Sequence, residues 1–159
     1  ISGDTMKPIT GSFNYGPVNS NSAVGGVCGR LGYSPYSISG CFNTASVTGT
    51  SVVGSVVGFN GDIIKDCRYV SGTGITPIGA NAGTTANVTA ETIANLQGQT
   101  GIDLLNKAIK DWNENGTYNG QSVKGSIYVC NYHFKADDAT TPANNGYPVI
   151  VTGAPQSNP

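Results

Sequence analysis

The only histidine of this 159-residue chain, His133, is the first residue that could support catalysis. A Ser–His–Asp arrangement would combine it with one of the many serines and with Asp137 or Asp138, so that the imidazole could accept the proton of a serine hydroxyl. No nucleophile-elbow motif accompanies these residues. A single histidine in a strand is more often a half-buried polar residue than a general base, and we do not expect nucleophilic catalysis here.

A group of charged residues close in sequence could instead act on polysaccharides. Its members are Asp62, Lys65, Asp66 and Arg68. Enzymes on parallel β-helices place paired acids and bases on one long face, and glycoside hydrolysis needs two carboxylates roughly 5 to 9.5 Å apart. Asp62 directly follows a glycine, so an ordinary solvated turn is the simpler interpretation. Calcium binding by Asp62 and Asp66 has the same weakness, because no EF-hand loop or Asp-bearing nonapeptide repeat surrounds them.

Four cysteines are present: Cys28, Cys41, Cys67 and Cys130. No two of them form a CxxC pair, so neither a zinc knuckle nor a redox centre is predicted, and we expect no metal and no cofactor. An even number of cysteines is compatible with disulfides in an oxidising compartment. Small buried thiols in a repeat core explain the cysteines at least as well, and the pairing stays open.

Two tyrosines of one loop, Tyr33 and Tyr36, are the candidate ligand-binding residues. The loop of residues 32–37 is an insertion relative to the repeat that follows it. Because aromatic side chains give a large contact area at a small entropic cost, an exposed loop of this kind could contact a glycan or a host or extracellular protein. The alternative is that both side chains fold back over the edge of the repeat.

The composition restricts the classes of partner. Charged residues are 11% of the chain and its net charge is −1, with no basic run, so nucleic acid is not an expected partner. No stretch approaches the roughly 18 consecutive apolar residues that a membrane span requires. A hydrophobic content of 38% argues against disorder except near the termini. Because the chain begins with Ile1, we interpret it as a processed product or an excised fragment.

The first half of the chain contains an internal repeat. Residues 9–14 (ITGSFN) align with residues 38–43 (ISGCFN) at a shift of 29 residues, and the same shift carries residues 23–29 onto residues 52–58. A third unit opens with residues 64–67, 26 residues after the corresponding part of the second unit. One unit of 26 to 29 residues cannot bury its apolar face alone, so we expect the units to stack.

The expected fold follows from the residues within each unit. Ile38 and Cys41 would face opposite sides of a straight strand, so we expect a bend between them. Four glycines indicate close backbone approaches or bends: Gly25, Gly29, Gly54 and Gly58. We predict a mainly β fold, a short parallel β-solenoid or β-roll, with a Gly-rich antiparallel sandwich as the alternative.

Three segments of the second unit carry a family resemblance: residues 38–44 (ISGCFNT), 47–49 (VTG) and 53–61 (VGSVVGFNG). They are similar to the GLUG repeat, which occurs in bacterial surface proteins and is named from IgA-specific metallopeptidases. The resemblance covers about residues 9 to 75 and departs from the pattern at Ser55, where a second glycine is usual. It implies a repeat scaffold of a gut-bacterial cell surface. Protease activity is not implied, because the chain has no HExxH motif.

Two helices are predicted after the repeats. Thr89 can cap a helix over about residues 90–97, which Gly98 ends. A stronger helix covers about residues 103–114, with Gly116 placed to end it. Its apolar face comprises Leu104, Leu105, Ala108, Ile109 and Trp112.

Two strands are predicted near the end of the chain. Alternation indicates a strand over residues 126–135, and a second strand covers residues 147–152, with the turn signal Asn145-Gly146 before it. This part of the chain is similar to the segment that commonly closes GLUG-repeat surface proteins of gut bacteria. We therefore expect it to cap an open end of the stack.

The sequence thus predicts three segments: GLUG-like β-repeats over residues 1–75, a helical and β capping segment over residues 76–152, and a tail over residues 153–159. We expect a non-catalytic module of a secreted or cell-surface bacterial protein, acting in adhesion, in glycan or protein binding, or as a structural spacer. The alternative is a fragment of a carbohydrate-active β-helix enzyme, similar to a glycosidase or lyase. The ligand, the handedness of the stack, the oligomeric state and the size of the parent protein stay open.

Overall fold

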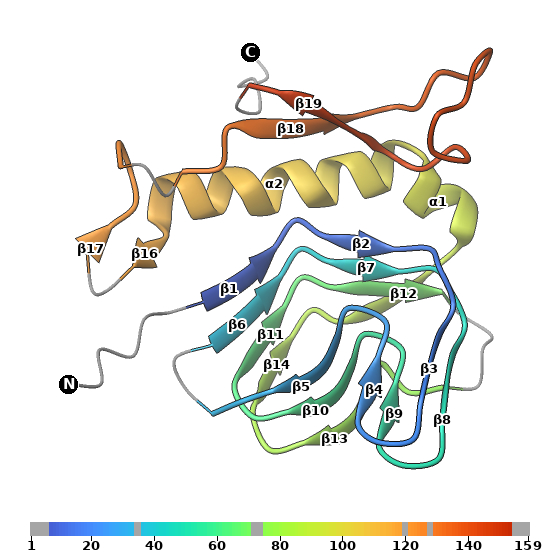
Figure 1. Cartoon of the computed structure of the whole chain (residues 1–159). Helices are drawn as coiled ribbons and strands as arrows, with labels where there is room; N and C mark the ends of the chain where they lie inside the picture. The colour runs from blue at the N-terminus through green and yellow to red at the C-terminus, as the bar shows by residue number, and fades with distance from the viewer. Residues whose placement is uncertain (1–6, 34–35, 71–74, 119–120, 127–128, 154–159) are drawn as a thin grey trace.

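The structure is a computed structural model that describes residues 7–33, 36–70, 75–118, 121–126 and 129–153 (Figure 1). The described chain is mainly β, as predicted, with two helices after the repeats. Its strands are short because Gly, Ser, Thr and Asn interrupt the Val- and Ile-rich runs every few residues.

Each of the first two repeats folds into five short strands. Those of the first repeat are β1 (Lys7–Thr10), β2 (Phe13–Asn14), β3 (Val18–Ser20), β4 (Val24–Gly25) and β5 (Cys28–Leu31). Those of the second are β6 (Tyr36–Ser39), β7 (Phe42–Asn43), β8 (Val47–Gly49), β9 (Val53–Gly54) and β10 (Val57–Asn60). After them come β11 (Ile63–Lys65), β12 (Arg68–Val70), β13 (Ile78–Asn81), β14 (Thr84–Ala86) and β15 (Thr89–Glu91).

Equivalent strands of successive repeats pair in parallel, and their register follows the sequence alignment. Ile38 lies opposite Ile9, 29 residues earlier, and opposite Ile64, 26 residues later. Val18 lies opposite Val47 at the same shift of 29 residues. The two predicted shifts are therefore confirmed. Parallel pairing of the repeats also makes the alternative of an antiparallel sandwich wrong.

The paired strands form several sheets. Two have four strands, in the orders β1-β6-β11-β14 and β15-β12-β7-β2, and one has three, in the order β13-β10-β5. Pairing extends past residue 75, where the predicted repeat region ends, because β14 pairs with β11 and β15 with β12 at a shift of 21 residues. The shift is smaller because no described strand between β12 and β13 matches β8 and β9, which pair only with β3 and β4.

A residue with left-handed backbone marks the same corner in every repeat. The φ angles of Gly11 and Gly40 are +54° and +59°, and those of Asp66 and Asn87 are +51° and +54°. Each of these residues turns the chain from the first four-stranded sheet into the second. The bend predicted after Ile38 is thereby confirmed at Gly40.

Inward-facing side chains of successive repeats stack into one core. Its fully or nearly fully buried members are Leu31, Ile38, Cys41, Val56, Val57, Ile64 and Cys67. Because neighbouring side chains of a strand point to opposite faces, Ser37 and Ser39 on either side of Ile38 lie on the outer face of the sheet. The same alternation places Lys65, next to the buried Ile64, on that outer face.

The first helix, α1 (Ile93–Gln97), begins later than predicted. Its N-cap is Thr92, whose hydroxyl accepts a hydrogen bond from the Asn95 amide at 3.2 Å. Thr89, the predicted cap, lies in β15 instead, because that strand continues the parallel pairing. Gly98 ends α1 as predicted.

The second helix, α2 (Gln99–Asn115), lies across the corners of the first two repeats. Leu105, Ala108 and Ile109 are buried on its apolar face, as predicted. A Cβ atom added to Gly40 would lie 2.1 Å from the Cβ of Ala108, so the helix approaches the corner closely only because the corner is glycine. The helix was expected over an open end of the stack, but it lies along the side (Figure 1).

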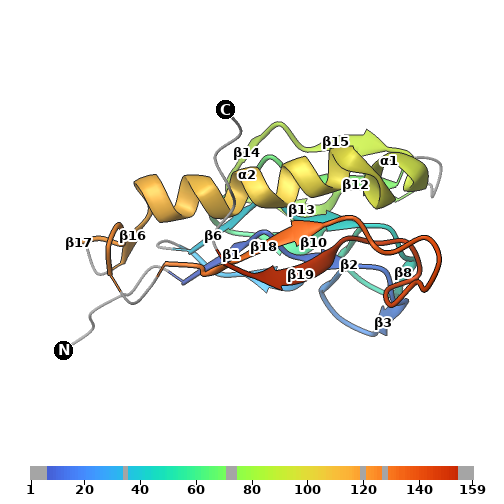
Figure 2. The same ribbon diagram turned by 90° about the horizontal axis from the view of Figure 1, so that it is seen from above.

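A β-hairpin lies beside α2 (Figure 2). Its antiparallel strands are β18 (Tyr132–Lys135) and β19 (Val149–Thr152). Two helix asparagines hold this segment: Asn106 bonds both backbone polar groups of Phe134, at 2.7 and 2.8 Å, and Asn113 bonds both of Cys130, at 2.7 and 2.9 Å. A second antiparallel pair follows α2: β16 (Thr117–Tyr118) and β17 (Gln121–Ser122).

The strand predicted over residues 126–135 is correct only in its second half, since β18 begins at Tyr132. Cys130 precedes that strand and has an asparagine side chain, not a strand, as its hydrogen-bond partner. Residues 127–128 of the predicted strand and residues 154–159 of the predicted tail lie outside the described residues.

Candidate functional site

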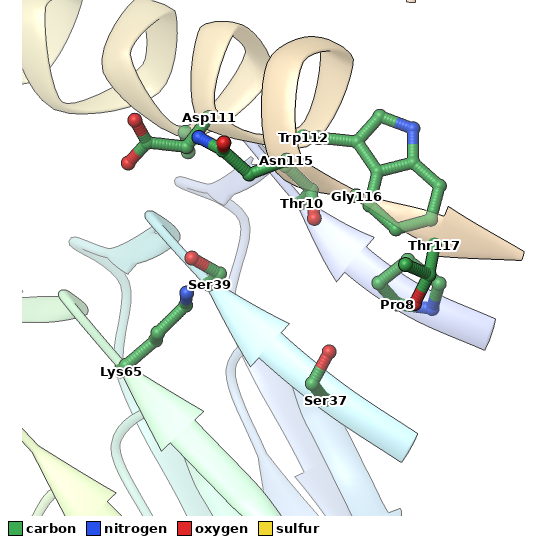
Figure 3. Close-up of a pocket in the computed structure, with 11 residues that line it drawn as sticks. Pro8, Thr10, Ser37, Ser39, Lys65, Asp111, Trp112, Asn115, Gly116 and Thr117 are labelled. Atoms are coloured by element: carbon green, nitrogen blue, oxygen red, sulfur yellow. The ribbon is translucent and has the colours of Figure 1, made fainter. Parts of the chain in front are cut away.

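A pocket of about 360 Å³ lies between α2 and the outer face of the sheet that contains β1, β6 and β11. We call it the α2 pocket. The sheet contributes Pro8, Thr10, Ser37, Ser39 and Lys65. The second half of α2 contributes Ala108, Asp111, Trp112 and Asn115, and the residues after it, Gly116 and Thr117, complete the lining (Figure 3).

Strand register aligns three polar side chains along the floor of the pocket. Thr10 pairs with Ser39, and Ser39 pairs with Lys65. Neighbouring strands lie about 4.8 Å apart, so this row presents a hydroxyl, a second hydroxyl and an ammonium group at nearly equal intervals. Figure 3 shows these side chains on the strands that face the helix.

The polar groups of the floor have no partners within the described chain. Among the described residues, no hydrogen bond involves the hydroxyl of Thr10, Ser37 or Ser39, and none involves the side-chain amide of Asn115. Each hydroxyl can donate one hydrogen bond and accept two, and the amide can do both. The pocket therefore offers several unused donors and acceptors to a ligand.

The aromatic member of the pocket is Trp112, in the last turn of α2. The backbone of Gly116 lies against its indole, since a Cβ atom at Gly116 would lie 2.6 Å from Cε3 of the ring. The Gly116 amide also donates to the Trp112 carbonyl at 2.8 Å and ends the helix. A glycine is thus needed for the ring to sit on the side of Pro8 and Thr117 (Figure 3).

The predicted ligand-binding tyrosines do not line the α2 pocket. Tyr33 is 63% exposed and meets the ring of Phe59 edge to face, with centroids 6.1 Å apart. The guanidinium of Arg30 lies over the same Phe59 ring, 4.5 Å from its centroid. Tyr36 is half-buried and packs against the core of the stack. One tyrosine is therefore displayed and the other folded back, and residues 34–35 between them lie outside the described residues.

The residues considered for nucleophilic catalysis have separate structural roles. His133 Nδ1 lies 2.9 Å from the carbonyl oxygen of Gly153. Asp137 accepts hydrogen bonds from backbone amides of the loop that follows it. Hydrogen bonds from the hydroxyl and the backbone amide of Thr140 hold the pKa of Asp138 below its usual range. The two carboxylates thus shape the loop before β19.

The charged residues around β11 do not form a paired-carboxylate site. Asp62 and Asp66 flank the two ends of the strand, four residues apart, so their Cα atoms are roughly 13 Å from each other. Asp62 accepts a hydrogen bond from the Tyr36 amide at 2.6 Å, and Asp66 from the Asn87 side chain at 2.7 Å. Arg68 bonds backbone carbonyls. Among the described residues, no group of three His, Cys, Asp or Glu could hold a metal ion.

All four cysteines are free thiols in the structure. Cys41 and Cys67 are fully buried, occupy equivalent positions in successive repeats, and each donates to the carbonyl oxygen two residues earlier, at 3.4 and 3.3 Å. The hydrogen bond with Cys67, followed by burial, raises the pKa of the Cys41 thiol. The structure therefore shows a stack of core thiols at this corner.

Comparisons with known proteins return no match among family models, curated proteins or solved structures. The resemblance to the GLUG repeat accordingly rests on the sequence segments themselves. Within the described residues, no helix is both long enough and apolar enough to cross a membrane.

Proposed function

We propose that this chain is a non-catalytic glycan-binding module of a secreted or cell-surface bacterial protein. In this proposal its stacked parallel sheets form a short β-solenoid, and α2 closes one side of that solenoid into a binding site. The observation that carries the proposal is the α2 pocket, in which an indole stands beside a floor of unpaired hydroxyl groups.

The chemistry of the α2 pocket is complementary to a sugar. A pyranose ring has an apolar face of C–H groups and an edge of hydroxyl groups. The indole of Trp112 offers a flat apolar surface for the C–H face of the sugar. Thr10, Ser39 and Asn115 offer hydrogen-bond donors and acceptors for the hydroxyl groups of the sugar. Binding pockets gain specificity from a small number of precisely placed polar groups of this kind.

The number of carboxylates at the site favours a binding function over a hydrolytic one. Glycoside hydrolysis uses two carboxylates that flank the scissile bond. Among the described lining residues, Asp111 is the one carboxylate, and it is paired with Lys107. A cell-surface location is supported by the scarcity of charged residues and by the resemblance of the repeats to GLUG repeats.

A glycan array tests the proposal. The proteins to compare are the wild type, Trp112→Leu, and the double variant Thr10→Val with Ser39→Ala. Circular dichroism and thermal unfolding first establish that each is folded. We expect binding by the wild type and at least a tenfold weaker apparent affinity for both pocket variants, because each removes contacts worth about 1.4 kcal/mol or more.

Tyr33→Ala is the matched control, because it removes an exposed aromatic side chain outside the α2 pocket. We expect it to bind like the wild type. Loss of binding in Tyr33→Ala but not in the pocket variants would move the site to the loop of residues 32–37. A wild-type protein that binds no glycan would contradict the proposal and favour a structural spacer.

A further inference from the structure

Lys65 is the charged residue on the floor of the α2 pocket. Its side chain rises from β11 toward the row formed with Thr10 and Ser39, as Figure 3 shows. No carboxylate lies within ion-pair distance of its ammonium group among the described residues. The cavity therefore contains a cation that the described chain does not neutralise.

The acidic groups nearest in the structure have other partners. Asp111, which also lines the cavity, forms an ion pair with Lys107 on the preceding turn of α2. Asp66, which follows Lys65 in sequence, accepts a hydrogen bond from Asn87 at 2.7 Å. Lys110 pairs with Glu114 and is not part of the lining. The charge left for a ligand in this cavity is thus positive.

We infer that the α2 pocket binds a carboxylated saccharide, whose carboxylate pairs with Lys65 while its hydroxyl groups contact the Thr10–Ser39 row and its ring packs against Trp112. This inference rests on the proposed glycan-binding function and specifies the chemical class of the glycan. Both uronic acids and sialic acids carry the required carboxylate. Because Lys65 lies at one end of the row, its pairing with the carboxylate fixes the direction in which the sugar lies across the strands.

The test compares acidic oligosaccharides with their neutral counterparts. The probes are oligomers of galacturonic, guluronic and mannuronic acid, a hyaluronan oligosaccharide and a sialylated oligosaccharide. Each is paired with the same compound after reduction of its carboxylates to primary alcohols. Dissociation constants are measured by titration calorimetry with the full chain at low and at high salt.

We expect at least one acidic probe to bind about three- to tenfold more tightly than its reduced counterpart, as for a partly exposed ion pair. The advantage should shrink in high salt, because screening weakens the charge pair. Comparable binding of the acidic and reduced compounds would overturn the inference and leave the glycan-binding function standing. Absence of binding by any probe, acidic or neutral, would overturn both.

Two variants locate the charge. Lys65→Met keeps the length of the side chain and removes the ammonium group, so it should bind the acidic probe only as well as the reduced one. Lys110→Met removes a lysine of α2 that does not line the cavity. This variant should keep the difference in affinity between the acidic probe and its reduced counterpart. Equal losses of affinity for the acidic probe in the two variants would show that the overall positive charge of the surface, and not Lys65, attracts the carboxylate.

Discussion

Asparagine side chains link successive repeats at two corners of the stack. Asn14 donates to Asn43 at 2.9 Å, and Asn60 donates to Asn81 at 2.7 Å. Asn43 is 1% exposed and also bonds both backbone groups of Ala45, at 2.9 and 3.2 Å. One side chain therefore satisfies a tight turn and a neighbouring repeat at once.

Replacing Asn43 by alanine should destabilise the protein by about 2 to 3 kcal/mol, because the amide and carbonyl of Ala45 and the side-chain amide of Asn14 lose their partners. Asn14→Ala, at the first repeat, should cost only about 1 kcal/mol because Asn14 is less buried. Urea unfolding followed by circular dichroism measures both changes. Similar losses in the two variants would show that burial in the middle of the ladder has no special effect.

Some of these residue-scale features could be read from the sequence and others could not. The 29-residue alignment places Asn14 opposite Asn43, because the two segments are nearly identical. Asn60 and Asn81 are 21 residues apart, and the segments around them share little sequence, so their pairing is visible only in the structure. Lys65 was noted for its charged neighbours, but its place in the α2 pocket depends on the helix.

Among the elements, α2 makes contacts that a single added carbon atom would disrupt. Both corner glycines of the first two repeats meet it: a Cβ atom at Gly11 would lie 2.9 Å from Ile109, and one at Gly40 would lie 2.1 Å from Ala108. Their positive φ angles add a backbone cost for any other residue. The packing of α2 and the shape of the α2 pocket therefore depend on these glycines.

Gly40→Ala should destabilise the protein by about 2 to 4 kcal/mol, combining the cost of a left-handed alanine with the displacement of α2. Gly125→Ala is the control: its φ is +75°, but no atom of the described residues lies within 4 Å of the added Cβ, so only the backbone cost of about 1 kcal/mol remains. Thermal unfolding compares the two. Equal decreases in the melting temperature of the two variants would mean that the contact between α2 and Gly40 adds no cost to the substitution.

The sequence predicted these elements where a strong periodic pattern exists. The buried face of α2 follows from apolar residues at helical spacing, including Leu105 and Ile109. The cap of α1 was assigned to Thr89 because threonine is a good N-cap, but strand pairing at β15 overrides that local preference. Alternation over residues 126–135 likewise suggested a strand where the Asn113 side chain takes the place of a partner strand.

At the scale of the whole molecule, the second repeat is protected from both sides. Its strands β6, β7 and β10 each pair with a strand of the repeat before and of the repeat after. By contrast, β14 pairs with β11 alone among the described strands, and all of its residues are exposed. Local stability should therefore fall from the middle of the stack toward β14.

Hydrogen exchange followed by mass spectrometry tests this gradient. We expect the amides of β6, β7 and β10 to exchange at least about a hundredfold more slowly than those of β14. The reason is that opening β14 exposes little apolar surface, whereas opening the second repeat disrupts the core around Ile38 and Ile64. Uniform exchange across all repeats would instead indicate that the stack opens as one unit.

The mainly β class and the parallel order of the repeats could be predicted because each repeat needs a neighbour to cover its apolar face. The repeat shifts align Thr10, Ser39 and Lys65 on neighbouring strands, but the α2 pocket could not be predicted, because no sequence pattern places the end of α2 over these strands. Trp112 illustrates this: its spacing assigns it to the apolar face of α2, but it lies beyond the corner glycines and lines the cavity.

The shrinking shift between repeats, from 29 to 26 to 21 residues, has a consequence for polymerisation. Among the described strands, the first repeat contributes all five strands at one end of the stack, whereas toward the opposite end β8 and β9 stop one or two layers before β13, β14 and β15. The stack is therefore level at one end and stepped at the other. Through these described strands, a second copy added head to tail could not pair with every sheet at once, and this mismatch disfavours growth of the stack into fibres.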